Sequence, residues 1–177
     1  MKFNKKYKPL LDPKERKKHN LRYIILSGGR GSGKSVAGSH FLHDVSFEKD
    51  NVILHTRFTM SSAKISVIPE FEQVVHDRNS LDFFESSNNQ IINQLSGANI
   101  IFKGLKTGSL TQTAQLKSVT NLNIWLLDEA EELHDESVFD DVDESIRRVG
   151  YENIIILLLN TYRITKDHFI YKRFFAE

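Results

Sequence analysis

The sequence predicts an α/β domain in which a mostly parallel central β-sheet is flanked by helices. Four short apolar runs without alternating polar positions indicate strands buried on both faces: "RYIIL" (22–26), "NVILH" (51–55), "NIWLL" (123–127) and "NIIILLL" (153–159). Apolar residues at spacings of three and four between these runs indicate amphipathic helices. A glycine-rich segment directly after the first run indicates that the chain makes room there for a ligand.

Three helices are expected, over residues 36–45, 65–75 and 136–149. Pro69 lies inside the second pattern, where it either kinks the helix or marks its boundary. Residues 90–103 contain short apolar stretches next to Ser-Ser-Asn-Asn and Ser-Gly-Ala, which favour turns. We therefore expect a small β-hairpin or meander inserted before the third apolar run.

The length and composition favour one globular domain. The chain has 177 residues, of which 40% are hydrophobic, and it contains no cysteine, which excludes a disulfide framework and a thiolate metal site. It has neither an apolar run of the roughly 18 to 20 residues that span a membrane nor the apolar core of a signal peptide. We expect a soluble intracellular protein without a membrane partner.

Positive charge is concentrated at the N-terminus. The first 22 residues carry nine Lys and Arg against two Asp and Glu, a balance of +7, whereas the remaining residues carry 15 against 21, a balance of −6. We divide the chain into a basic N-terminal arm over 1–20 and a folded domain over 21–177. The arm either neutralises nucleic-acid phosphates or is a solvated tail.

The segment "SGGRGSGKS" contains the spacing G-x-x-x-x-G-K-[ST] of a phosphate-binding loop, or P-loop. Its backbone N–H groups and the positive end of the following helix would hold the β-phosphate, with Lys34 at the β and γ oxygens and Ser35 on Mg²⁺. A chance match is the alternative, but the expected strand before the loop and helix after it are the context that this motif requires. The predicted nucleotide-binding residues of the loop are Gly28, Gly29, Arg30, Gly31, Ser32, Gly33, Lys34 and Ser35.

The third apolar run ends in two adjacent carboxylates. Asp128 at a strand end can hold Mg²⁺, and Glu129 can polarise an attacking water. The alternative is a helix N-terminus enriched in acids, and Glu131 and Glu132 are interpreted in that way. An Asp-Glu pair after a P-loop predicts a P-loop NTPase of the Asp-Glu (ASCE) type, and favours nucleotide hydrolysis over phosphorylation of a small molecule.

Polar residues at the ends of the runs predict where the ligand lies. Ser27, Asp128 and Asn160 each terminate a buried run, and ligands of such sheets bind beyond the carboxyl ends of the strands. Asn160 either binds the γ-phosphate or the lytic water, or it is an ordinary turn residue. Arg30 either counters charge on the γ-phosphate or points outward to acids or nucleic acid.

Other basic residues leave two interpretations open. Arg57, which follows the second run, contacts either nucleic-acid phosphates or water, as do Lys103, Lys106 and Lys117. Arg147 and Arg148 are either an arginine finger for a neighbouring subunit or favourable charge near a helix C-terminus. The seven histidines show no metal-ligand spacing, so no histidine metal site is predicted.

Three quoted stretches together resemble a known family. They are "YIILSGGRGSGKS", "IIFKGL" followed by "LKSVTNLNIWLLDEAEEL", and "ILLLNTYR" followed by "DHFIYKRFF". Over roughly residues 20 to 177 the chain resembles the ATPase domain of the large terminase subunit of tailed bacteriophages, the motor that packages double-stranded DNA into proheads.

The resemblance implies a role for each matching position. Residues 28–35 correspond to the family's phosphate loop, Arg30 to its loop arginine, Asp128 to its Mg²⁺-side aspartate and Glu129 to its catalytic glutamate. Asn160 falls in the coupling motif, where Asn-Thr replaces the usual Asn-Pro or Ser/Thr-Asn pair and leaves the role of Thr161 open. The segment around Tyr23 loosely resembles the region that contacts adenine.

The resemblance also implies an activity and partners. We expect hydrolysis of Mg-ATP, with Glu129, Lys34 and Arg30 catalytic, to drive double-stranded DNA translocation by a ring, expected to be pentameric, on the prohead. The implied partners are the portal protein and the small terminase subunit, and the implied location is the cytoplasm of the infected bacterium and not the mature virion. The family's C-terminal nuclease domain is absent from this chain, so nuclease activity is not expected. The alternatives are another Asp-Glu P-loop motor such as a helicase, or an ATP-binding assembly module that does not hydrolyse ATP.

Overall fold

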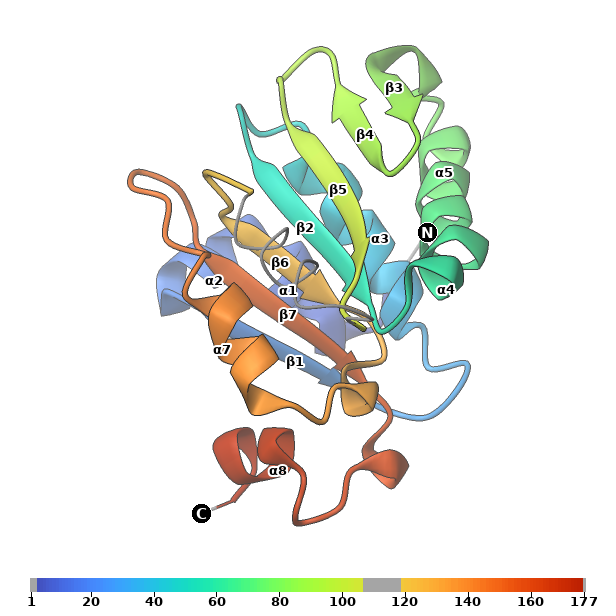
Figure 1. The fold of residues 1–177 in the computed structure, drawn as a ribbon. Coiled ribbons are helices and arrows are strands. Elements are labelled where there is room, and N and C mark those ends of the chain that lie inside the picture. The colour runs from blue at the N-terminus through green and yellow to red at the C-terminus, as the bar shows by residue number, and fades with distance from the viewer. Residues whose placement is uncertain (1–2, 107–118, 177) are drawn as a thin grey trace.

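A seven-stranded mixed sheet forms the centre of the computed structural model, which describes residues 3–106 and 119–176 (Figure 1). Its strand order is β1-β7-β6-β2-β5-β4-β3. The first five of these strands pair in parallel, and β4 and β3 add an antiparallel edge. The strands are β1 Tyr23–Ser27, β2 Val52–Arg57, β3 Phe84–Ser87, β4 Gln90–Asn93, β5 Asn99–Gly104, β6 Ile124–Leu127 and β7 Ile154–Leu159. The predicted parallel sheet and its hairpin, here β4 and β5, are confirmed.

Helices cover both faces of the sheet. They are η1 Lys5–Tyr7, α1 Lys8–Leu11, α2 Pro13–His19, α3 Lys34–Val45, α4 Met60–Ile65, α5 Val67–Asp77, η2 Leu81–Phe83, η3 Ala130–Glu132, α7 Glu136–Asp143, η4 Thr161–Arg163 and α8 Phe169–Phe174. Pro69 is the third residue of α5, where its missing N–H has no helical partner to lose, so it marks the start of the helix. Within 3–106 and 119–176, no helix has the length and apolar character needed to cross a membrane.

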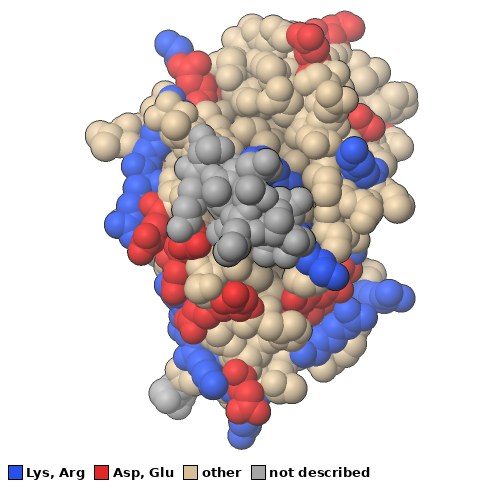
Figure 2. All heavy atoms as spheres, viewed as in Figure 1, with Lys and Arg blue, Asp and Glu red and all other residues tan. Residues whose placement is uncertain are grey.

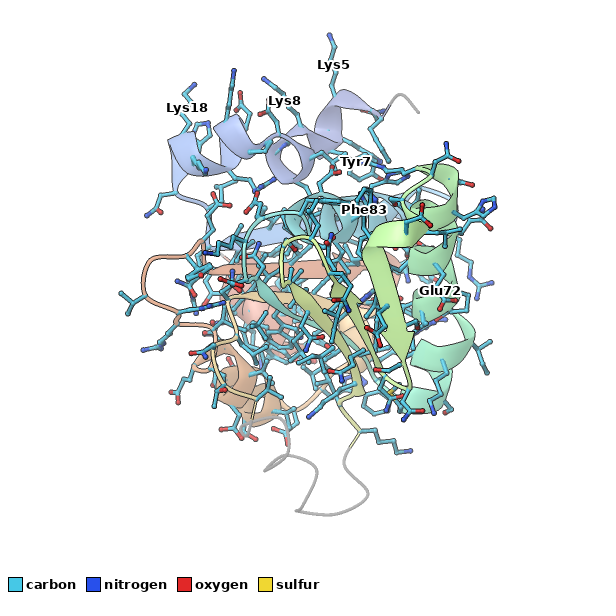
Figure 3. All side chains as sticks on the ribbon, turned by 90° about the horizontal axis from the view of Figure 1, so that it is seen from above. Lys5, Tyr7, Lys8, Lys18, Glu72 and Phe83 are labelled. Carbon is cyan, nitrogen blue, oxygen red and sulfur yellow. The ribbon has the colours of Figure 1, made fainter. Side chains whose placement is uncertain are left out.

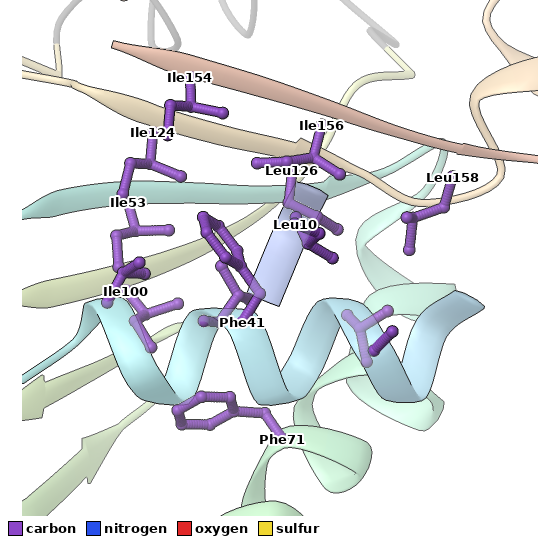
Figure 4. Packing of buried hydrophobic residues seen from close by; sticks show 14 of the residues in the cluster. Leu10, Phe41, Ile53, Phe71, Ile100, Ile124, Leu126, Ile154, Ile156 and Leu158 are labelled. Atoms are coloured by element: carbon purple, nitrogen blue, oxygen red, sulfur yellow. The ribbon is translucent and has the colours of Figure 1, made fainter. Parts of the chain in front are cut away.

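The apolar runs lack polar alternation because each face of the sheet packs against its own hydrophobic cluster. Every residue of β7 is buried, and alternate side chains enter opposite clusters. Ile154, Ile156 and Leu158 pack in the cluster that contains Phe41 of α3 and Phe71 of α5 (Figure 4). The second cluster contains the other three β7 residues and side chains of α7 and α8, namely Ile155, Leu157, Leu159, Phe139, Val142, Phe169 and Ile170.

The predicted helix over 136–149 is shorter than expected, because α7 ends at Asp143. Arg22, next to β1, donates to the carbonyl oxygens of Asp143 at 3.0 Å and Ile146 at 3.1 Å, and to the Asp143 carboxylate at 2.6 Å. These bonds satisfy the carbonyl group of the last residue of α7 and that of Ile146, three residues further on. Val149, which the helical pattern included, is 96% exposed.

The basic N-terminal segment packs on the domain. Tyr7 and Leu10 are buried in the cluster that contains α3 and α5. Figure 3 shows Lys5, Lys8 and Lys18 projecting outward, while Tyr7 turns towards the body of the domain. On the face seen in Figure 2, basic and acidic side chains lie interspersed. Apolar side chains of residues 5–19 therefore extend the core, and Arg16 is buried with them, 3.5 Å from Glu152. The boundary at residue 20 remains a prediction.

Replacing Gly104 with alanine is expected to destabilise the fold. A Cβ atom at this position, the last residue of β5, would lie 2.4 Å from the backbone nitrogen of Met60 and 2.8 Å from the carbonyl carbon of Thr59. Because backbone atoms must move to relieve this overlap, we expect the free energy of unfolding to fall by about 1 to 3 kcal/mol in urea denaturation. Gly29→Ala is the control, since its Cβ would meet no atom within 4 Å. Equal urea midpoints for the two variants would contradict the packing described here.

Candidate active site

The site lies where the carboxyl ends of β1, β7 and β6 meet. The order of the strands places β7 between the strand before the glycine-rich loop and the strand before Asp128. Ser27 pairs with Leu159, and the N–H of Gly28 donates to the Leu159 carbonyl at 3.2 Å. Asn160, the next residue, therefore lies beside the loop.

A cavity of about 410 Å³ opens at this edge of the sheet. It is lined by Arg30, Gly31, Ser32, Gly33, Lys34, Ser35, Val36, Arg57, Ser66, Glu70, Asp128, Glu129, Leu158 and Asn160. Most of the predicted site residues thus share one cavity, and the remaining two, Gly28 and Gly29, bind Lys34 through their carbonyl groups.

Glycine is required where the loop turns into α3. Gly31 and Gly33 have φ angles of 72° and 83°, in the left-handed region that other residues rarely adopt. Gly33 is the N-cap of α3, which begins at Lys34. The free N–H groups and positive end of this helix therefore face the cavity, an arrangement that favours a bound anion.

Lys34 is buried at the base of the loop, with 9% of its surface exposed. Its Nζ donates to the carbonyl oxygens of Gly28 at 2.7 Å and Gly29 at 3.1 Å. It also donates to Ser32 Oγ and to Asn160 Oδ1, both at 3.2 Å. The ammonium group is thus held in the loop by four oxygen atoms, and phosphate oxygens could replace the two loop carbonyls among them.

Asp128 is a buried carboxylate, 6% exposed, whose N–H donates to the Thr56 carbonyl at 2.9 Å. Burial raises the pKa of Asp128 to about 6, although Arg57, 3.8 Å away, opposes the rise. Ser35 lines the same cavity. Hydroxyl and carboxylate oxygens suit Mg²⁺, and a carboxylate that is buried without full charge compensation gains from a cation, so the donor set fits this ion.

Asp128→Asn is expected to stabilise the protein when divalent cations are chelated. The pKa of Asp128 is about 6 in the folded protein against an ordinary value of 3.8, so the ionised form destabilises the fold above pH 6. In EDTA at pH 8, the asparagine variant should have a free energy of unfolding higher by up to about 3 kcal/mol in urea denaturation. The gain should shrink as the pH falls through 6 towards about 4. A variant less stable than the parent at pH 8 would contradict this assignment.

Glu129 and Arg57 form a two-bond ion pair inside the cavity. Glu129 has a left-handed backbone, with φ 51°, where the chain turns out of β6. Arg57 Nε donates to Glu129 Oε2 at 3.0 Å, and Arg57 Nη2 lies 2.5 Å from Glu129 Oε1. Ser66 Oγ accepts from the third guanidinium nitrogen. Both carboxylate oxygens of Glu129 therefore face one cation.

A model of a protein family described as phage terminase large subunit matches residues 20–177. The chain belongs to this family. No curated protein matches it.

Solved structures of phage terminases share the fold of this terminase chain. The HK97 bacteriophage large terminase is 14% identical with a TM-score of 0.73, and the match covers 96% of this chain and 35% of that one. The large terminase of a thermophilic bacteriophage is 16% identical with a TM-score of 0.69, covering 90% and 39%. The N-terminal domain of the DNA packaging ATPase from bacteriophage phi29 is 17% identical with a TM-score of 0.58, covering 85% and 78%. The chain thus spans well under half the length of the first two proteins.

Several polar residues in or beside this cavity are not among the predicted site residues. Arg57, Ser66 and Glu70 line it, and Glu131 binds Asn160 from outside the lining. Arg57 ends β2 as Asp128 follows β6, and β2 pairs with β6. The position of Arg57 at the end of a strand, like that of Asp128, was the signal that could have placed it in the cavity. The sequence instead predicts nucleic-acid phosphates or water as its contacts. Glu131 was interpreted as an ordinary acid of a helix N-terminus, whereas it is buried and binds Asn160.

Several other residues lie away from the terminase cavity. Tyr23 donates its hydroxyl to Asp143 at 2.9 Å and packs on Phe174, so it does not line the site. Arg148 donates to the carbonyl of Asp50, which precedes β2 and so lies at the amino end of that strand, opposite to the site. Arg147 lines a cavity together with Arg148 and lies four residues beyond Asp143, the last residue of α7. Lys117 is outside the described residues.

A larger cavity of about 630 Å³ occupies the opposite edge. Its lining includes Arg16 and Arg22, but these cations already lie beside acids. Arg16 is 3.5 Å from Glu152, and Arg22 is 2.6 Å from Asp143. The cavity also lacks the glycine loop and helix N-terminus, so the smaller cavity is the better phosphate site.

Proposed function

We propose that this terminase chain binds Mg-ATP in the cavity at the end of β7 and hydrolyses it to drive double-stranded DNA into a prohead. The observation that carries the proposal is that Lys34, Asp128, Glu129 and Asn160 line one cavity at the N-terminus of α3. Membership of the terminase large subunit family supports it. So does the fold shared with the phi29 protein, which is described as a DNA packaging ATPase.

Each group has a chemical task in the proposed reaction. Lys34 exchanges the Gly28 and Gly29 carbonyls for β- and γ-phosphate oxygens, and Arg30 counters charge that develops on the γ-phosphate. Water attacks the γ-phosphorus, Glu129 accepts the proton, and the bond to the β–γ bridging oxygen breaks to release ADP. Ser35 and Asp128 would hold Mg²⁺, which when bound neutralises charge on the phosphates.

A second candidate function is an ATP-binding assembly module that does not hydrolyse ATP. The ion pair of Arg57 with both oxygens of Glu129 favours it, because both carboxylate oxygens face the guanidinium and not a water molecule while the pair persists. In the hydrolysis proposal, Glu129 must leave Arg57 before each turnover. Slow turnover by the isolated domain is therefore expected.

The proposed motor acts within an assembly. We propose a ring, pentameric by the family resemblance, on the portal of the prohead in the cytoplasm of the infected bacterium, with the small terminase subunit as a further partner. An arginine contributed by a neighbouring subunit would add to the charge that Arg30 supplies.

Phosphate release by the purified chain tests the proposal. We expect Mg-ATP to be hydrolysed, the activity to disappear in EDTA, and blunt double-stranded DNA to stimulate it more than single-stranded DNA. Stimulation by single-stranded DNA alone would favour a helicase. ATP binding by calorimetry with no phosphate release in any condition would favour the assembly module and defeat the hydrolase.

A further inference from the structure

Asn160 lies between a cation and an anion. On one side its Oδ1 accepts from Lys34 Nζ at 3.2 Å. On the other side its Nδ2 donates to Glu131 Oε1 at 2.6 Å, and its backbone N–H donates to Glu131 Oε2 at 3.1 Å. A single carboxylate therefore holds both the side chain and the backbone of the residue that follows β7.

These contacts determine which way the Asn160 amide points. If the amide turned over, its oxygen would face the Glu131 carboxylate and its NH₂ group would face the Lys34 ammonium. Both contacts would be repulsive, and Lys34 and Glu131 would each lose the hydrogen bond that the Asn160 amide now makes to it. Lys34 on one side and Glu131 on the other thus fix the amide with its oxygen towards Lys34. Of these two residues, Glu131 is the one that does not line the proposed nucleotide cavity.

Glu131 is itself fixed in place. It is 3% exposed and lies in η3, directly after the Glu129 turn. His168 Nδ1 accepts from the N–H of Ile170 at 3.2 Å, so the proton is on Nε2, which donates to the Glu131 carbonyl at 3.2 Å. His168 is the N-cap of α8, so this bond joins η3 to the last helix.

Glu131 is absent from the lining of the phosphate cavity, whereas Asn160 and Lys34 are part of it. Its carboxylate therefore meets the residues of the cavity through its hydrogen bonds to Asn160. Its neighbour Glu132 provides a comparison, because it carries the same charge one position away. Glu132 lies 3.7 Å from Arg163 at the surface.

We propose that Glu131 is a positioning residue for the phosphate site. It holds the Asn160 amide with its oxygen towards Lys34, so that the ammonium group keeps one protein ligand when phosphate oxygens replace the loop carbonyls. The kinetic part of this inference rests on the proposed ATP hydrolysis, but the hydrogen bonds exist without it.

NMR of ¹⁵N-labelled protein without nucleotide tests the positioning directly. The Asn160 side-chain proton bound to Glu131 should resonate downfield of other side-chain amides and exchange slowly with solvent, because it donates to a buried carboxylate. Glu131→Gln should remove both properties, and Glu132→Gln should preserve them. An Asn160 amide in the wild-type protein that resembles solvent-exposed amides would overturn the proposal, even if the Glu131 variant does not fold.

Kinetics provide the second arm. Glu131→Gln should lower kcat for ATP about 10-fold to 100-fold, with a much smaller change in KM, because the loss is one of geometry. Glu132→Gln should leave kcat close to that of the wild type. In an Asn160→Ala background, Glu131→Gln should have no further effect on kcat, whereas a merely structural role would add its full effect. Additive effects would overturn the proposal, and a wild-type protein without turnover would defeat the hydrolase proposal while the NMR result stands.

Discussion

Replacing Glu129 with glutamine is expected to lower kcat for ATP by a factor of about 10² to 10⁴, because a carboxamide cannot accept the proton of the attacking water. ATP binding should persist, since glutamine keeps the shape of the side chain and Lys34 remains in the loop. The measurement is phosphate release at saturating Mg-ATP beside the dissociation constant of a nonhydrolysable ATP analogue.

The control for this prediction is Glu132→Gln. This substitution removes the same charge three residues away, at a side chain that does not line the phosphate cavity. If Glu129→Gln releases phosphate as fast as the wild type, Glu129 is not the base. The acid-base role would then have to pass to another carboxylate of the cavity, such as Glu70.

Replacing Lys34 with methionine is expected to weaken binding of the ATP analogue about 10-fold to 150-fold. A hydrogen bond to a charged group contributes about 1.5 to 3 kcal/mol, and methionine keeps the apolar stem but donates nothing. Isothermal titration calorimetry measures the change, and circular dichroism checks that the variant is folded.

Lys64→Met is the matched control for Lys34. Lys64 is exposed in α4 and does not line the cavity, so its removal changes the net charge by the same amount without changing the site. Equal affinities for the Lys34 variant and the wild type would place the phosphates elsewhere.

The fold was largely predictable because its strongest signals are local. The run over 153–159 has no polar residue after Asn153, and only a strand covered on both faces buries every residue of β7. The end of α7 was not predictable in this way. It depends on Arg22, which is more than a hundred residues distant in the chain and reaches the carbonyl group of Asp143 across the fold.

The site residues that belong to contiguous motifs could be predicted from the sequence. Those that join the site only through the pairing of two strands could not. The loop over 28–35 and the Asp128–Glu129 pair are contiguous stretches, so their positions follow from the chain alone. Arg57 joins them only through the pairing of β2 with β6, and Glu131 joins Asn160 only through the neighbouring ends of β6 and β7. Neither pairing can be read from one sequence.

A crystal structure with Mg²⁺ and a nonhydrolysable ATP analogue tests the central claim most directly. We predict the γ-phosphate at Lys34 and the N–H groups of the loop, Mg²⁺ at Ser35 and Asp128, and the Glu129 carboxylate facing the γ-phosphate. Triphosphate density in the larger cavity beside Arg16 and Arg22, or Glu129 and Asp128 remote from the bound γ-phosphate, would contradict the account.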